Sequence, residues 1–174
     1  IRLQKKQLSE EDNMEVVVVT GDGSAYGMGL SATSGAMDRN LDYIYLCYDN
    51  EGYGNTGQQY SAATPHAAIT STSKTSHGYP GFKKDLFSIW VAHAPAYVAT
   101  IIGAEPLDLA KKIEKLRSMN GPRMLIALSP CPTGWDYDPK HSVEIGRLAV
   151  QTGVWPLKEY IDGEVVHTKI PKKD

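Results

Sequence analysis

The segment MEVVVVTGDGSAYG (14–27) decides the fold class of this chain of 174 residues. Its first half, Met14–Thr20, is a continuous apolar and β-branched run that stops at Gly21. Such a run is typical of a strand buried on both faces, so we expect a central strand of a parallel sheet. Residues 24–40 follow with a weak helical pattern, and Leu41–Tyr48 is again strand-like. Together they predict a strand, helix, strand unit with a crossover connection.

The rest of the chain continues this alternation. Further strands are expected at 97–102 and 123–129, and helices at 83–94, 106–119 and 139–152. Asp162-Gly163 lies between two apolar runs, which is typical of a β-hairpin. The sequence therefore predicts one α/β domain over residues 1–174, a mostly parallel sheet flanked by helices, with a leading segment at 1–13 and a C-terminal extension at 155–174.

Charge and hydropathy exclude several classes of protein. The chain carries 18 Lys plus Arg against 20 Asp plus Glu, a net charge of -2. A protein that binds nucleic acid by covering phosphates would show a large cationic excess. The longest apolar stretch, Val16–Val19, is far shorter than the roughly 20 residues that span a bilayer, and the chain does not open like a signal peptide. We expect a soluble, cytoplasmic protein with no nucleic-acid or membrane partner.

The chain has two cysteines, Cys47 and Cys131. This number excludes a disulfide scaffold and leaves any thiolate metal site within the chain incomplete. Cys47 falls inside a predicted strand, so we assign it to the core. The sequence starts at Ile1 without a methionine, and we interpret it as the later part of a longer subunit.

Three polar segments follow the ends of predicted strands, at 21–23, 49–57 and 130–135. Ligands of parallel α/β sheets bind beyond the carboxyl ends of the strands. The stretch from 49 to 80 is rich in Gly, Ser, Thr, Asn and Tyr and has no sustained period. Long irregular loops inside compact domains are usually functional, so we expect a binding site there.

Gly21-Asp22-Gly23 has the composition of a phosphate-binding turn. Glycine lets backbone amides at a helix start approach a phosphate closely. An aspartate beside a phosphate makes sense if a divalent cation lies between them, and Mg²⁺ is commonly held in this way. Taken alone, the motif is better explained as an ordinary turn with a solvated aspartate.

Asp49-Asn50 favours the metal-binding interpretation over the ordinary turn. It follows the next predicted strand, and 25 residues separate it from Gly23. Adjacent parallel strands would bring the Asp22 carboxylate and the Asn50 amide oxygen to neighbouring loops. A backbone carbonyl just beyond Asn50 could complete an oxygen shell for Mg²⁺.

This pair of motifs, with DN in place of the usual NN, resembles the fingerprint of thiamine-diphosphate enzymes. In that family an aspartate, an Asn-type residue and a main-chain carbonyl two positions further on hold Mg²⁺ against the diphosphate. The resemblance implies that Asp22, Asn50 and Gly52 take these roles here.

Three longer segments resemble the β subunit of the 2-oxoacid:ferredoxin oxidoreductases, of the pyruvate or the related oxalate type. They are YDNEGYGNTGQQYSAATP (48–65), ALSPCPTGW (127–135) and SVEIGRLAVQTGVWPL (142–157). The resemblance extends over about residues 16–157. It implies the thiamine-diphosphate-binding fold, in its diphosphate-binding half.

The resemblance also assigns residue roles. Asn55 would lie beside the thiazolium and the substrate as the candidate catalytic residue. The alternative is that Asn55 is only a loop residue with a left-handed backbone conformation. Tyr53 would pack on the cofactor or simply be a buried loop aromatic, and Thr56 would add a phosphate contact. The full set of implied cofactor-binding residues is Gly21, Asp22, Gly23, Ser24, Ala25, Asn50, Gly52, Tyr53, Asn55 and Thr56.

Cys131 matches one of four thiolate ligands of a 4Fe-4S cluster in that family, whose other three ligands come from a more N-terminal stretch that this sequence lacks. One or two thiolates cannot hold a cluster that takes four. The five histidines show no ligand spacing. Lys83-Lys84 and Lys111-Lys112 are interpreted as solvated helix charges.

The activity implied by the resemblance is oxidative decarboxylation of a 2-oxoacid, with electrons passed through the cluster to ferredoxin and the acyl group to coenzyme A. Pyrimidine-binding and ferredoxin-like subunits would be partners, and the glutamate that activates the aminopyrimidine would come from one of them. The alternatives are oxalate or another 2-oxoacid as substrate, a non-redox thiamine-dependent decarboxylase or carboligase, and a phosphate-binding module without catalysis. The last alternative predicts binding that does not require Mg²⁺.

Overall fold

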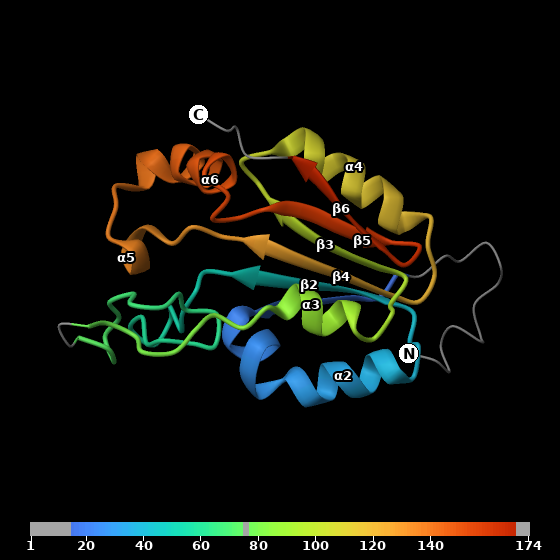
Figure 1. The fold of residues 1–174 in the computed structure, drawn as a ribbon, viewed down its shortest axis with the longest axis horizontal. Coiled ribbons are helices and arrows are strands. Elements are labelled where there is room, and N and C mark those ends of the chain that lie inside the picture. Colours follow the sequence, from blue (N-terminus) through green and yellow to red (C-terminus); the bar gives the residue numbers. More distant parts are fainter. Residues whose placement is uncertain (1–14, 75–76, 170–174) are drawn as a thin grey trace.

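A computed structural model describes residues 15–74 and 77–169, and these form a six-stranded sheet with helices on both faces (Figure 1). The strand order is β1-β2-β4-β3-β5-β6. The bounds are β1 Val17–Gly21, β2 Tyr43–Asp49, β3 Tyr97–Ile102, β4 Pro122–Leu128, β5 Leu157–Ile161 and β6 Glu164–Lys169. The first four strands are parallel, and β5 and β6 are antiparallel. This confirms the predicted mostly parallel α/β sheet.

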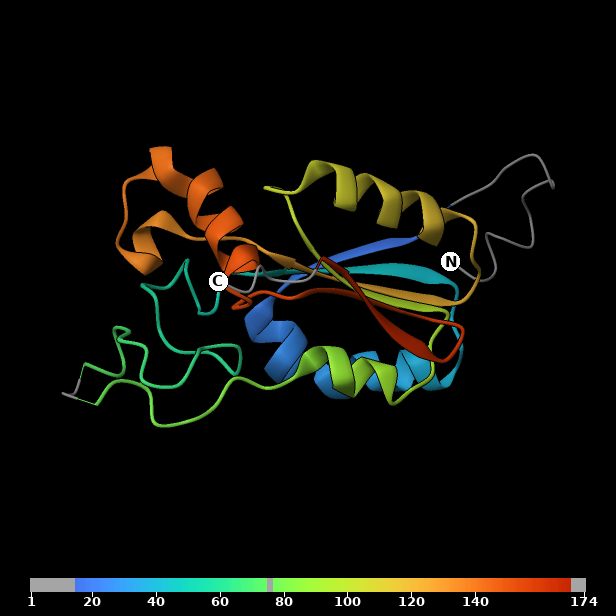
Figure 2. The same ribbon diagram turned by 45° about the horizontal axis from the view of Figure 1, so that its top comes forward.

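The predicted helical segments are confirmed with shorter bounds, and the short helix α5 was not predicted. The helices are the π-helix η1 Gly23–Met28, α2 Leu30–Asp38, α3 Leu86–Val91, α4 Pro106–Arg117, α5 Pro132–Trp135, the 3₁₀-helix η2 Pro139–His141 and α6 Ser142–Gln151. Helices α2 and α3 cover one face of the sheet and α4 covers part of the other (Figures 1 and 2). No helix in the described part of the chain is long and apolar enough to cross a bilayer.

Helix α4 shows how the sequence produces this packing. Leu109, Ile113 and Leu116 recur at helical spacing and pack with Ala99 and Leu125 of the sheet. Pro106 occupies the first turn, where its missing N–H costs no helical hydrogen bond. The predicted hairpin is also confirmed, because Asp162 and Gly163 both have positive φ and join β5 to β6.

The prediction that the first strand is central in the sheet is wrong. Strand β1 is an edge strand that pairs only with β2 among the described residues. Val17 and Val19 are 54% and 61% exposed. An apolar, β-branched run indicates a strand, but it does not reveal whether the strand has one neighbour or two.

The prediction for Cys47 is confirmed, since its side chain is fully buried in the main core cluster. The interpretation of Lys112 as a solvated charge is wrong. Its side chain is 1% exposed, and its ammonium donates to Asp108 at 2.6 Å and to the carbonyl of Thr100 at 2.9 Å. The predicted leading segment, residues 1–13, lies outside the described residues.

Candidate active site

The carboxyl ends of β1 and β2 open into a cavity of about 200 Å³. In Figure 1 the irregular chain after β2 and helix α5 lie at this end of the sheet. Nine of the ten residues assigned to the cofactor site from the sequence line the cavity: Gly21, Asp22, Gly23, Ser24, Asn50, Gly52, Tyr53, Asn55 and Thr56. The structure therefore brings together two segments of the chain that are separated by a helix and a strand.

Ala25 does not line the cavity. Its side chain is fully buried in the core, because it lies on the side of η1 that packs against the sheet. Asn55 and Thr56 are exposed at the rim, and the Thr56 hydroxyl is paired with the side chain of Gln59 and the carbonyl of Tyr53. Asn55 is thus free to face a molecule that enters from solvent.

Gly23 is required by the local packing. A Cβ at this position would lie 2.1 Å from the ring of Tyr53, far inside van der Waals contact. The Tyr53 hydroxyl also donates to the Gly23 carbonyl at 3.4 Å. Tyr53 therefore packs on the glycine turn itself, so the turn after β1 and the segment after β2 are in direct contact.

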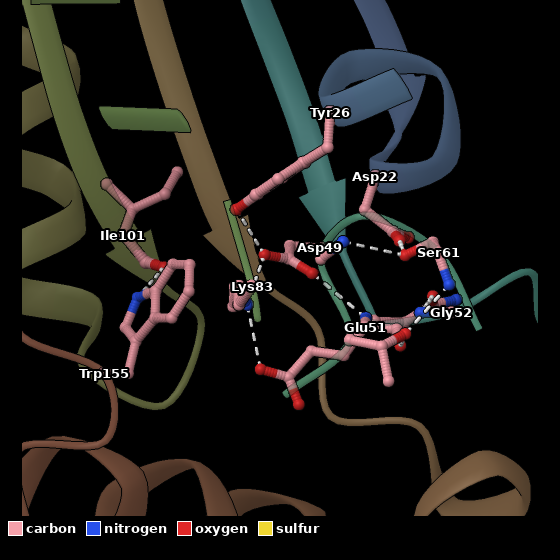
Figure 3. A network of polar contacts seen from close by, with 12 residues as sticks. Asp22, Tyr26, Asp49, Glu51, Gly52, Ser61, Lys83, Ile101 and Trp155 are labelled. Atoms are coloured by element: carbon pink, nitrogen blue, oxygen red, sulfur yellow. Dashed lines mark hydrogen bonds and ion pairs between the residues drawn. The ribbon is translucent and has the colours of Figure 1, made fainter. Parts of the chain in front are cut away.

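Asp22 is the buried carboxylate of the site. Only 2% of the residue is exposed, and the hydroxyl of Ser61 donates to its Oδ2 in a short hydrogen bond (Figure 3). Burial raises the pKa of Asp22 to about 6; the hydrogen bond from Ser61 lowers it and the charge of Asp49 raises it. No Lys, Arg or His in the described ranges forms an ion pair with Asp22, so its charge lacks a cationic partner.

The segment after β2 turns sharply beside Asp22. The backbone N–H of Gly52 donates to Asn50 Oδ1 at 3.2 Å, which forms an Asx turn. The hydroxyl of Thr64 donates to the Glu51 carbonyl at 2.6 Å, and Glu51 has a left-handed φ of 64°. A Cβ on Gly52 would lie 2.8 Å from the side chain of Gln58. The positions of Asn50 and Gly52 are therefore fixed by the turn.

The oxygen atoms around Asp22 and Asn50 suit a hard divalent cation as ligands. They comprise one carboxylate, one amide oxygen and backbone carbonyls, which are the oxygen ligands that Mg²⁺ takes together with phosphate oxygens. No group of three His, Cys, Asp or Glu side chains in residues 15–74 and 77–169 could hold a metal by itself. A cation at this place would accordingly need further oxygens from its ligand.

Cys131 lies close to the same segment. It caps the short helix α5 and is half-buried, and its Sγ accepts from the backbone N–H of Gly134 at 3.4 Å. In the same helix the indole of Trp135 donates to the Asn50 carbonyl at 3.1 Å. The third predicted segment therefore contacts the second one through Trp135.

Sequence reasoning missed five residues of the polar network beneath the cavity: Tyr26, Asp49, Glu51, Ser61 and Lys83 (Figure 3). The interpretation of Lys83 as a solvated charge is wrong. Its side chain is 25% exposed, and its ammonium binds Asp49 at 2.8 Å and Glu51 at 2.9 Å. The sequence did carry one signal that Asp49 is buried. Every second side chain of β2 points into the core, and these are Tyr43, Tyr45, Cys47 and Asp49.

The sequence is similar to known thiamine pyrophosphate proteins. Residues 5–127 match the family model described as "Thiamine pyrophosphate enzyme, C-terminal TPP binding domain". The pyruvate synthase subunit PorB of Methanosarcina barkeri is 42% identical over 167 residues, 94% of this chain and 56% of that protein. The ketoisovalerate oxidoreductase subunit VorB of Pyrococcus furiosus is 40% identical over 168 residues, 94% of this chain and 54% of that protein. The chain spans about half the length of these relatives.

A solved structure is also similar. It is a 2-oxoglutarate:ferredoxin oxidoreductase from Magnetococcus marinus with 2-oxoglutarate, coenzyme A and succinyl-CoA bound. The TM-score is 0.66 and the sequence identity 26%, over 82% of this chain and 47% of that one. The similarity therefore includes the arrangement of the sheet as well as the sequence.

Proposed function

Because the chain belongs to the thiamine pyrophosphate enzymes, as their C-terminal TPP-binding domain, we propose that it binds thiamine diphosphate and Mg²⁺ within a 2-oxoacid:ferredoxin oxidoreductase. The reaction is oxidative decarboxylation of a 2-oxoacid, with pyruvate as the substrate that most relatives' names support. A cytoplasmic location, and pyrimidine-binding and ferredoxin-like subunits, ferredoxin and coenzyme A as partners, belong to the same proposal.

One observation carries the proposal: the buried Asp22, which has no cationic partner within residues 15–74 and 77–169, lies where the turn after β1 meets the segment after β2. Asp22, the Asn50 side chain and the Gly52 carbonyl would hold Mg²⁺, and the amides that follow Gly23 would face the diphosphate. A cavity of about 200 Å³ is small and open to solvent, which suits the diphosphate end of the cofactor. The remainder would be enclosed by a partner subunit.

When bound, thiamine diphosphate supplies an electron sink for the bond that breaks when a 2-oxoacid loses CO₂. The tasks of this chain are placement and electrostatics. Asp22 would neutralise part of the charge of a bound cation, and Asn55 at the rim would donate its amide N–H to the oxygens of the substrate. The resemblance assigns the glutamate that activates the aminopyrimidine to a partner subunit.

Cys131 is proposed as one ligand of a 4Fe-4S cluster. The contact between Trp135 and Asn50 holds its loop beside the cofactor segment, which suits electron transfer from the site. The remaining three thiolates would lie outside this sequence, because Cys47 is fully buried in the core. Cys131→Ser should lower the iron content of the purified complex, whereas Cys47→Ala should leave it unchanged.

The experiment that tests the function uses the purified complex. Pyruvate should reduce ferredoxin or a viologen dye, and removal of thiamine diphosphate or Mg²⁺ should stop the reaction. A panel of 2-oxoacids that includes 2-oxoisovalerate and oxalate identifies the preferred substrate. Decarboxylation or carboligation without any electron transfer, by a complex that contains no iron, would favour the non-redox alternative.

A further inference from the structure

A buried ion-paired cluster joins the two halves of the candidate site. We call it the Lys83 clasp and define it as Lys83, Asp49, Glu51 and Tyr26 (Figure 3). We propose that Lys83 is a positioning residue for cofactor binding: its ammonium holds the metal-binding segment 49–52 in place against the turn after β1. This inference rests on the proposed function, because it concerns the segment that would hold Mg²⁺.

Lys83 lies far along the chain from its two carboxylate partners. It lies just before α3, whereas Asp49, the last residue of β2, and Glu51, just after that strand, lie 34 and 32 residues earlier. The ion pairs therefore close the long irregular loop at its base. Asn50, Gly52, Asn55 and Thr56 all lie within or directly beside the closed loop. Closing a loop of this length has an entropic cost, and the contact that closes it fixes the residues near the closure most strongly.

Asp49 joins the clasp to the other half of the site. The residue is fully buried, and its Oδ2 accepts from the Tyr26 hydroxyl at 2.6 Å as well as from Lys83 at 2.8 Å. Its Oδ1 accepts from the backbone N–H of Glu51 at 3.0 Å. Tyr26 belongs to η1, which begins directly after Asp22. One carboxylate thus joins the turn after β1, the segment after β2 and the end of the loop.

Lys83 is itself held in place by residues of the core. Its ammonium lies 5.1 Å from the ring centroid of Trp155 and 5.7 Å from that of Tyr26. Trp155 is buried, and its indole donates to the carbonyl of Ile101 in β3 at 3.1 Å. Burial lowers the pKa of Lys83, but Asp49 and Glu51 raise it above the ordinary value, so the ammonium stays charged. The clasp therefore places the metal-binding segment relative to the centre of the sheet.

The chain offers a matched control for the test. Lys115 also pairs with a carboxylate that is almost fully buried, Glu159, and that carboxylate also accepts from a buried tyrosine, Tyr97, at 2.6 Å. None of these three residues lines the cavity. Lys83→Met and Lys115→Met each remove an ammonium from the same kind of cluster, and only the first change touches the clasp.

The measurement is calorimetric titration of the full complex with thiamine diphosphate at several Mg²⁺ concentrations. Lys83→Met should raise the Mg²⁺ concentration needed for half-maximal binding by about tenfold. Lys115→Met should leave that concentration within about twofold of the wild-type value, although both variants melt at a lower temperature. Lys83→Arg should recover most of the affinity, since a guanidinium can bridge the same two carboxylates.

A double variant separates positioning from simple charge compensation. Asp49→Asn combined with Lys83→Met leaves no unpaired Asp49 charge, so this protein should fold even if the single Lys83 variant does not. If Lys83 positions the segment, the double variant still needs more Mg²⁺ than the wild type. Wild-type affinity in the double variant, or equal effects of Lys83→Met and Lys115→Met, would overturn the proposal. Failure of the wild-type complex to bind thiamine diphosphate would instead overturn the proposed function.

Discussion

Two buried clusters in this fold are built from the same parts but differ in charge. Around Glu159, a carboxylate accepts from Tyr97 and Lys115, and the neighbouring Lys112 pairs with Asp108. Around Asp49, a carboxylate accepts from Tyr26 and Lys83. Both clusters place a tyrosine and a lysine on one buried carboxylate, so they share the same physical solution for burying a charge.

The difference lies in how many charges are left over. The Glu159 cluster contains two carboxylates, Glu159 and Asp108, and two ammonium groups, Lys115 and Lys112, so its net charge is zero. The Asp49 cluster, which we define as the Lys83 clasp together with Asp22, contains three carboxylates, Asp22, Asp49 and Glu51, and one ion-paired ammonium, Lys83. An excess of buried negative charge costs stability unless a cation neutralises it. The first cluster needs no further charge, whereas the second fits the proposal that a divalent cation binds beside Asp22.

The largest expected effect comes from removing the carboxylate of Asp22, which has no ion-pair partner in the described part of the chain. Asp22→Ala should weaken Mg²⁺-dependent thiamine diphosphate binding by on the order of 100-fold or more, because the cation loses its charged ligand. Glu159→Gln in the balanced cluster should lower the free energy of unfolding by about 1–3 kcal/mol and leave binding unchanged. Calorimetry and chemical denaturation measure the two effects. Equal binding by Asp22→Ala and wild type would show that the excess charge has no role in the site.

A pH dependence should follow from the same excess charge. The pKa of Asp22 is about 6 in the folded protein against 3.8 for the ordinary group. The folded state therefore binds the Asp22 proton more tightly than the unfolded state does. The stability that this tighter proton binding adds to the fold is fully present below pH 3.8 and is lost as the pH rises through about 6. The loss corresponds to about 3 kcal/mol in the absence of cation.

Thermal denaturation of the wild type and of Asp22→Asn between pH 4 and 7 measures that contribution. The variant should lack the part of the pH dependence that Asp22 causes, and Mg²⁺ with thiamine diphosphate should stabilise the wild type more at pH 7 than at pH 5. Identical pH profiles for the two proteins would contradict the prediction.

The smallest expected effect separates the two tyrosines. Tyr26→Phe and Tyr97→Phe each remove one hydrogen bond to a buried carboxylate and should lower the free energy of unfolding by about 1–2 kcal/mol. Only Tyr26→Phe should also weaken cofactor binding, by roughly threefold, because Tyr26 joins η1 to the metal-binding segment. Equal binding by both variants would indicate that the Asp49 cluster is as purely structural as the Glu159 cluster.

The sequence predicts most of the sheet because strands and helices leave local patterns. The apolar runs predict β1 to β4, and Asp162-Gly163 predicts the β5–β6 hairpin. The position of β1 at the edge is not predictable in this way, because exposure of Val17 and Val19 depends on which strands and helices cover them. Local pattern specifies an element, while its neighbours are set by contacts between distant residues.

The two halves of the candidate site are predictable for a different reason. Gly21-Asp22-Gly23 and Asp49-Asn50 each follow a strand, and adjacent parallel strands end at the same edge of the sheet. Ser61 and Lys83 are not predictable, because they reach the site from an irregular loop whose course has no period. The same holds for Lys112, whose carbonyl partner on Thr100 comes from a different element.

The most direct test of the central claim is the Mg²⁺ dependence of thiamine diphosphate binding by the wild-type complex. The excess charge of the Asp49 cluster predicts measurable affinity with Mg²⁺ and its loss, by on the order of 100-fold, when the cation is chelated. Calorimetric titration with and without a chelator provides both values. Equal affinity under the two conditions would contradict the account and favour a phosphate-binding module that needs no cation.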